Sequence, residues 1–250
     1  MKMISASSAI RPMHRTRDRA VNFMHSLAFG SARSILCLGA HADDIEIGCG
    51  GTVLSLIKAI PDISIGWIVL SSGPQREAEA RHSAAAFLHG AADCSVEISD
   101  FRNGFFPYDA ALKDHFELLK QRYSPDLILT HRREDRHQDH RTVCELTWNT
   151  FRDHLILEYE IPKWDGDMGR PTVYVPLDTW TRDRKVECLM SSFQSQQSRH
   201  WYDAELFHGL MRLRGMECNA PDRCAEAFWA PKLTLALPQS VASSRFERST

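Results

Sequence analysis

The sequence lacks a long apolar run, a CxxC pair and any large excess of charge of one sign. No apolar run approaches the roughly 20 residues of a membrane span, and the basic stretch 1–30 lacks the apolar segment of a secretory signal. The seven cysteines are odd in number and scattered, which argues for a reducing compartment and against a disulfide framework or a zinc ribbon. The formal net charge of −2 provides no field that would draw the chain to nucleic acid or membrane.

Several motifs of other enzyme classes are also missing. The chain has no Walker motif, no G-x-S-x-G elbow and no H-E-x-x-H. "GCGG" at 48–51 resembles a dinucleotide-binding turn but lacks the G-x-G-x-x-G spacing, and Asp43, Asp44 and Glu46 stand where a pyrophosphate would lie. A nucleotide-binding oxidoreductase is therefore disfavoured. We expect these glycines instead to let the chain turn tightly around a metal and enter a helix.

The order of apolar and polar segments predicts an α/β protein. The chain has 250 residues, of which 43% are hydrophobic and 25% charged, as in a globular protein. Apolar runs predict strands, and helical spacing predicts the helices between them. We therefore expect a single Rossmann-like domain with a mostly parallel sheet flanked by helices. The expected strands are 34–40, 63–72, 94–99, 126–130, 155–160 and 172–177; the expected helices are 50–59, 76–90, 108–123, 141–153 and most of 181–229.

No linker divides the chain into two domains. We expect an N-terminal basic tail and helix over 1–33, with the helix from about Arg17 to Ala28. The main domain would span 34–235, and a C-terminal tail would follow over 236–250.

Two polar clusters follow predicted buried strands. "HADD" (41–44) comes directly after the first strand, and "HRREDRHQDH" (131–140) directly after the strand 126–130. Ligands in open parallel sheets bind beyond the carboxyl ends of the strands, so we expect both clusters at one edge. His41, one aspartate of the first cluster and one histidine of the second would form a His₂Asp site for a cation such as Zn²⁺. A helix N-cap would explain one aspartate but not two aspartates and a histidine.

Together the two clusters resemble the signatures of one family, the PIG-L / LmbE-like N-deacetylases. "GAHADDIEIGCGGTV" is similar to the family's A-H-P-D-D motif and Gly-rich turn, and "HRREDRHQDHRTV" to its H-P/Q-D-H motif. Weaker likeness in "REAEARHSAAAFLHG", "KVECLMSSFQSQ" and "CAEAF" extends the resemblance over about residues 34–230. The sequence departs from the pattern at Ala42, where the family has proline, and at Ile45, where glutamate is more frequent.

The resemblance implies a zinc-dependent hydrolase that removes an acetyl group from an N-acetylated amino sugar or its conjugate. Asp43 matches the general base, His137 the group that stabilises the oxyanion or protonates the leaving amine, and Asp139 the carboxylate that orients this histidine. Arg76 matches a substrate-binding arginine. The residues that match the metal ligands are His41, Asp44 and His140.

A further polar segment, "EYEIPKWDGDMGRP" (158–171), is a candidate substrate loop. Sugar-binding loops often pair an aromatic face with carboxylates, which makes Trp164 and Asp165 candidate contacts; a polar connection with one buried tryptophan is the alternative. His131 and Asp135 lie in the second cluster and could support the ligands, contact substrate or be solvated.

The motifs leave the identity of the substrate open, because their residues would contact only its reacting carbonyl group and not the rest of the molecule. The protein could hydrolyse an amide in a non-sugar small molecule, or be a catalytically silent binding protein on the same fold. His₂Asp also accepts divalent transition metals other than zinc. We expect a small-molecule N-acetylated substrate, no nucleic acid partner, no membrane span and a cytoplasmic location, with a homo-oligomer left open.

Overall fold

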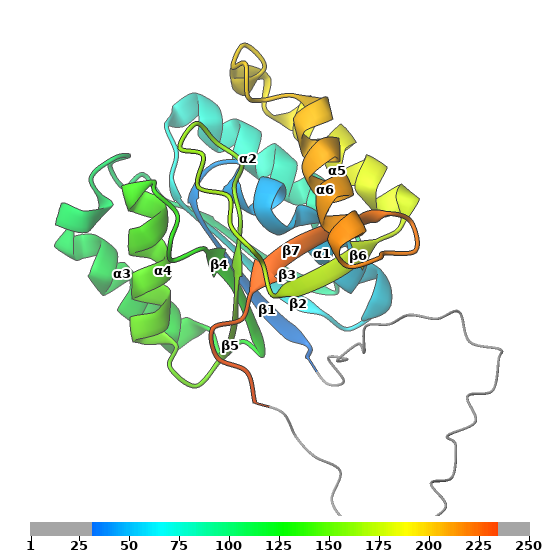
Figure 1. Ribbon diagram of the computed structural model, residues 1–250. Helices are drawn as coiled ribbons and strands as arrows, with labels where there is room; N and C mark the ends of the chain where they lie inside the picture. Colours follow the sequence, from blue (N-terminus) through cyan, green and yellow to red (C-terminus); the bar gives the residue numbers. More distant parts are fainter. Residues whose placement is uncertain (1–31, 235–250) are drawn as a thin grey trace, which may run out of the picture.

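The computed structural model describes residues 32–234, which form a seven-stranded sheet with helices on both faces (Figure 1). The N-terminal tail and the predicted helix 17–28 lie outside the described residues, as does the tail 236–250. The strands are β1 (Ser34–His41), β2 (Ser64–Ser71), β3 (Asp93–Ile98), β4 (Leu127–His131), β5 (Leu155–Tyr159), β6 (Val173–Leu177) and β7 (Cys224–Trp229). The helices are α1 (Asp44–Ala59), α2 (Pro74–Phe87), α3 (Ala110–Arg122), α4 (Gln138–Thr150), α5 (Thr179–Ser192) and α6 (Ala204–Glu217), with short 3₁₀ turns η1 (Phe106–Tyr108) and η2 (Gln194–Gln196).

The strand order is β3-β2-β1-β4-β5-β7-β6, which confirms the expected mostly parallel α/β sheet. Strands β1 to β5 pair in parallel, whereas β7 pairs antiparallel with both β5 and β6. The chain runs outward from β1 to β3 and then returns to place β4 on the other side of β1. The edge beyond β1 and β4 is therefore the switch point of the sheet, where parallel α/β proteins bind ligands.

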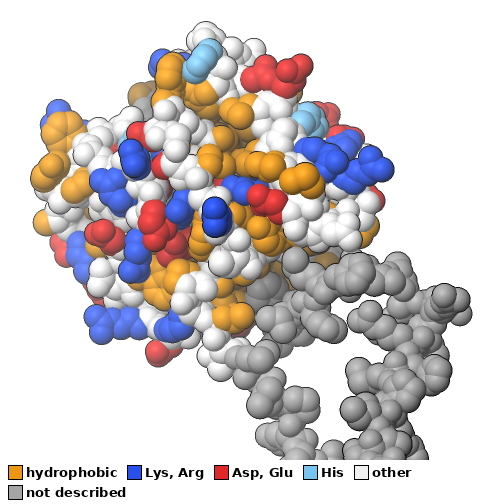
Figure 2. Space-filling view, viewed as in Figure 1, with side chains coloured by type: hydrophobic (Ala, Val, Ile, Leu, Met, Phe, Trp, Pro, Cys, Tyr) orange, Lys and Arg blue, Asp and Glu red, His pale blue; other side chains and the backbone are white. Residues whose placement is uncertain are grey.

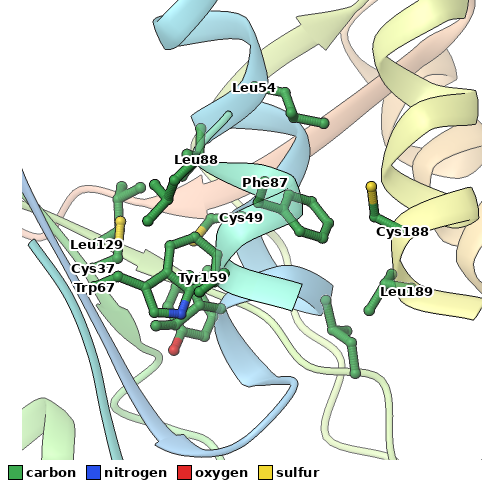
Figure 3. Close-up of a cluster of buried hydrophobic side chains, with 14 of the residues drawn as sticks. Cys37, Cys49, Leu54, Trp67, Phe87, Leu88, Leu129, Tyr159, Cys188 and Leu189 are labelled. Carbon is green, nitrogen blue, oxygen red and sulfur yellow. The ribbon is translucent and has the colours of Figure 1, made fainter. Parts of the chain in front are cut away.

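Side chains of the central strands alternate between two apolar cores. In β1, Ile35 and Cys37 face the core under α1, α2 and α5, whereas Leu36 and Leu38 face the core under α3 and α4. Figure 3 shows the first core, where Trp67 of β2 lies among side chains of the strands and helices. Burial on both faces explains why these strands read as continuous apolar runs.

The glycines of "GCGG" lie inside α1 and do not form the turn that we expected from the sequence. A Cβ on Gly48 would overlap the ring of the buried Tyr159, and one on Gly50 would lie 2.5 Å from Phe87. The turn itself is made by Asp43, and α1 begins at the next residue. These glycines therefore serve the close packing of α1 against β5 and α2.

One prediction of secondary structure was wrong: residues 224–229, expected to be helical, form the buried strand β7. Its short run of alanine and aromatic residues fits either a helix or a strand, and pairing with β5 and β6 decides between them. Two predicted helices also begin earlier than expected, α1 at Asp44 and α4 at Gln138. Both additional segments carry residues of the polar clusters.

The cysteines and one face of the surface can be described directly. All seven cysteines are free, and six of them are buried. On the face drawn in Figure 2, Lys and Arg side chains are interspersed with Asp and Glu, so this face shows no patch of one sign.

Gly48→Ala tests the contact between α1 and Tyr159. We expect this variant to lower the free energy of unfolding by about 1–3 kcal/mol, because the buried ring cannot move away from the new methyl group. Urea unfolding followed by circular dichroism measures the change.

Gly209→Ala on the exposed face of α6 is the matched control, since a Cβ added there would have no other atom within 4 Å. Alanine favours the helix at this position, and stability should rise by up to about 1 kcal/mol. Equal effects of the two substitutions would contradict the proposed packing role of Gly48.

Candidate metal centre

The first polar cluster is held in a strained turn between β1 and α1. His41 ends β1, and Asp43 adopts φ 103° and ψ −19°, a left-handed conformation that is costly for a residue other than glycine. Although Asp43 occupies the N-cap position of α1, its side chain makes no capping hydrogen bond. Helix capping therefore does not account for this aspartate, and the turn directs its carboxylate elsewhere.

Arg76 of α2 is the partner of Asp43. Its Nη2 lies 2.9 Å from Asp43 Oδ2 and also donates to the carbonyl oxygen of Ala42. Burial raises the pKa of Asp43 to about 7, against the lowering effect of the Arg76 charge. The arginine side chain is 28% exposed, so the structure places this predicted substrate contact at the edge of the cluster.

The second polar cluster spans the turn from β4 to α4. His131 ends β4, and α4 begins at Gln138 with His137 as its N-cap residue. His137 Nδ1 accepts a hydrogen bond from the amide of Asp139 at 3.2 Å. This bond occupies the lone pair of Nδ1, so the neutral ring carries its proton on Nε2. The imidazole lies next to those of His41 and His140, with centroids 4.9 and 4.5 Å away.

His41, Asp44 and His140 converge as the sequence predicted. His41 Nδ1 lies 3.3 Å from Asp44 Oδ2 and 3.3 Å from His140 Nε2, and His140 Nε2 lies 3.5 Å from Asp44 Oδ2. A tetrahedral ion with ligand distances of about 2.0–2.1 Å has edges of about 3.3–3.4 Å between its ligand atoms. The three donor atoms therefore have the chemistry and the spacing of three ligands of one ion, and all three residues are buried.

The charges of this cluster are suited to a cation. Burial disfavours the charged form of Asp44, but the surrounding imidazoles of His140, His131 and His41 hold its pKa well below the usual range. Burial is the main cause that lowers the pKa of His140 to about 3. An ionised carboxylate and a neutral imidazole are the forms that bind metal. Burial alone would lower the pKa of His41, but hydrogen bonds to Asp139 and Asp44 raise it to about 9.

Asp139 contacts a different histidine from the one we expected. Its Oδ2 lies 3.2 Å from His41 Nε2, and its carboxylate accepts hydrogen bonds from the amides of Gly104 and Phe106. Because Asp139 lies in the first turn of α4, its side chain points back toward β1 and the 102–106 segment. Asp139 thus orients His41 and leaves its Nδ1 facing Asp44 and His140, whereas His137 is hydrogen-bonded to the backbone amide of Asp139.

His131 and Asp135, whose roles the sequence left open, are both buried supports of the cluster. His131 Nε2 accepts from the amide of Ala40 at 2.9 Å, so its lone pair is not free for a metal ion. Asp135 Oδ2 accepts from His140 Nδ1 at 3.0 Å, which leaves His140 Nε2 facing Asp44. The sequence signal for both was their position, since His131 ends a buried strand and Asp135 lies five residues before His140.

The candidate substrate loop divides into buried and exposed parts. Trp164 is 72% exposed and its ring lies against that of His200, with centroids 4.3 Å apart and the planes tilted by 32°, so it is not the buried tryptophan of the alternative interpretation. Asp165 is exposed beside it. Glu158 belongs to β5 and is buried, accepting from Trp148 Nε1 and the amide of Arg133.

The fold and the site together define an α/β protein with a buried His/Asp cluster that could hold a metal ion at the switch point of its sheet. A family model described as GlcNAc-PI de-N-acetylase (PIG-L) matches residues 36–151. The uncharacterized deacetylase YaiS of Escherichia coli (strain K12) is 31% identical over 144 residues, which cover 52% of this chain and 75% of that protein. The chain belongs to the PIG-L family, a family of deacetylases.

Solved structures share the fold at low sequence identity. An N,N'-diacetylchitobiose deacetylase from Pyrococcus horikoshii is 17% identical with a TM-score of 0.64, covering 80% of this chain and 84% of that one. GalB, a 4-carboxy-2-hydroxymuconate hydratase from Pseudomonas putida KT2440, is 16% identical with a TM-score of 0.66, covering 83% of this chain and 100% of that one. Because one fold carries both activities, it does not by itself define the reaction.

Among residues 32–234, no helix is both long enough and apolar enough to cross a bilayer.

His140→Ala tests the metal centre. We expect the unaltered protein to bind one Zn²⁺ per chain, and this variant to bind it at least about 100-fold more weakly, because one of three protein ligands is lost. Competition with a chromogenic chelator measures the affinity.

His82→Ala is the control, because His82 is exposed on α2 and remote in sequence from both clusters. Its zinc affinity should match that of the unaltered protein. Full zinc affinity in His140→Ala would show that the ion binds elsewhere.

Proposed function

We propose that this protein is a metal-dependent hydrolase that removes an acetyl group from an N-acetylated amino sugar or a conjugate of one. The observation that carries the proposal is the convergence of His41 Nδ1, Asp44 Oδ2 and His140 Nε2 beside the carboxylate of Asp43. Membership of a deacetylase family supports amide hydrolysis as the reaction.

The three converging residues would hold the ion, and zinc is the metal that we propose. Bound there, the ion would supply Lewis-acid chemistry, activating water at neutral pH and polarising the amide carbonyl. His41 is oriented for this task by Asp139, and His140 by Asp135. The protein thereby fixes which nitrogen of each imidazole faces the ion.

Asp43 is the proposed general base. It receives the proton of the attacking water and passes it to the leaving amine as the C–N bond breaks, so that acetate and a free amine are released. The strained backbone turn and Arg76 fix the position of its carboxylate. Since Asp43 does not cap α1, its carboxylate is available for this role.

His137 is the proposed oxyanion stabiliser. Its Nδ1 accepts the Asp139 amide, so a neutral ring presents Nε2–H as a donor. Burial and the charge of His41 lower the pKa of His137, which favours this neutral form. A well-placed donor to a tetrahedral intermediate contributes about 3–4 kcal/mol of transition-state stabilisation.

Substrate contacts are proposed at Arg76, Trp164 and Asp165. Arg76 borders the base and is partly exposed, while Trp164 and Asp165 lie exposed in the segment between β5 and β6. The adjacent rings of Trp164 and His200 offer an aromatic surface against which a sugar or an attached group could pack.

The substrate would be a small N-acetylated molecule and not a nucleic acid, in keeping with the net charge of −2. We also propose a cytoplasmic location, since the seven free cysteines fit a reducing compartment. The proposed reaction does not depend on whether the protein forms a homo-oligomer.

Asp43→Asn tests the proposed reaction. We expect acetate release to fall by about 10²–10⁴-fold, because asparagine keeps the shape of the side chain but cannot accept the proton. Acetate is measured across N-acetylglucosamine, its phosphates, its glycosides and its nucleotide-linked forms, with and without a chelator.

Asp62→Asn, an exposed aspartate in the loop before β2, is the matched control and should leave acetate release unchanged. No release from any of these substrates by the zinc-bound protein would contradict N-acetyl sugars as the substrate class. Release that persists in the Asp43→Asn variant would contradict the role of the base.

A further inference from the structure

Lys163 places a buried positive charge between two aspartates. Its side chain is only 11% exposed, and Nζ lies 2.9 Å from Asp135 Oδ2 and 2.6 Å from Asp167 Oδ2. Asp135 lies between β4 and α4, whereas Lys163 and Asp167 lie between β5 and β6. The lysine therefore joins the segment 161–168 to the segment that precedes His140.

Asp135 connects this lysine to the metal centre. The same oxygen that contacts Lys163 accepts from His140 Nδ1 at 3.0 Å, and Oδ1 accepts from the amide of His137 at 2.8 Å. One carboxylate thus contacts Lys163, the proposed ligand and the backbone of the proposed oxyanion stabiliser. With Nδ1 donating to Asp135, Nε2 of His140 presents its lone pair to the ion.

Asp167 completes the connection from the other side. Its Oδ2 accepts from the amide of Arg136 at 2.7 Å, and its carbonyl oxygen accepts from Arg132 Nη1 at 2.8 Å. Without the lysine, the carboxylates of Asp135 and Asp167 would face each other without a cation, and their repulsion would separate the two segments.

We infer that Lys163 is a positioning residue that couples the order of segment 161–168 to metal occupancy at His140, acting through Asp135. This inference rests on the metal centre of the proposed function. An ion on His140 Nε2 fixes the tautomer with the proton on Nδ1 and strengthens the hydrogen bond to Asp135. The fixed carboxylate holds Lys163, and reciprocity requires that the held segment favours metal binding equally.

The coupling has a consequence for substrate contacts. Trp164 follows Lys163 directly, and its ring is exposed and lies against that of His200. The same lysine that supports the ligand histidine thereby sets the place of the aromatic ring. Loading with metal would assemble the reacting centre and the proposed substrate surface together.

Hydrogen exchange of the unaltered full-length protein, with and without Zn²⁺, is the first test. We expect zinc to slow amide exchange across 161–168 by at least about threefold. Zinc that binds without changing exchange there would overturn the coupling while leaving the metal centre intact. Absence of zinc binding would overturn both the coupling and the metal centre.

Lys163→Met is the second test, with zinc affinity measured by chelator competition. Removal of a nearby positive charge would by itself tighten zinc binding. We expect the zinc affinity instead to fall by about 10–100-fold, and this fall would report the loss of positioning. Zinc should also no longer slow exchange in 161–168, and Lys163→Arg should restore part of both effects. Unchanged or tighter zinc binding in Lys163→Met would show a role unrelated to His140.

Lys58→Met is the matched control, because Lys58 forms an exposed ion pair with Asp178. Its zinc affinity and its zinc-dependent exchange should equal those of the unaltered protein. The measurements on the unaltered protein do not depend on whether the Lys163→Met variant folds.

Discussion

The candidate site depends on the parallel pairing of β1 with β4. The register sets Ile35 beside Leu127 and Cys37 beside Leu129, so the two strands end at the same edge of the sheet. Residues that are separated by about a hundred positions in the sequence thereby meet within hydrogen-bonding distance. Close packing on both faces fixes this register, because a shift by one residue would move each side chain into the opposite core, which is packed around residues of different shape.

A second constraint is the balance of buried charge. Asp44, Asp135 and Asp139 are each less than 4% exposed, and each contacts an imidazole of the cluster. A buried carboxylate without a partner is costly, so each of these contacts also fixes the orientation of a histidine ring. The network that stabilises the charges is thus the network that prepares two imidazoles for an ion.

The apolar core and the polar site are joined at Tyr159. Its ring packs against Gly48 of α1, while its hydroxyl donates to the carbonyl oxygen of Leu38 and lies 3.2 Å from His131 Nε2. One side chain of β5 therefore contacts the helix that carries Asp44, strand β1 and the end of β4. The position of the cluster is in this way tied to the packing of the sheet.

The sequence by itself determined the α/β class, the five parallel strands β1 to β5, and the residues that converge as candidate ligands. Periodicity and the two motifs carry that information locally, because each motif directly follows an apolar run. Only the tertiary structure decided that residues 224–229 form a strand, that Asp139 faces His41, and that Lys163 reaches Asp135. These three outcomes depend on contacts between segments distant in sequence, where backbone pairing and buried charge, and not local propensity, determine the conformation.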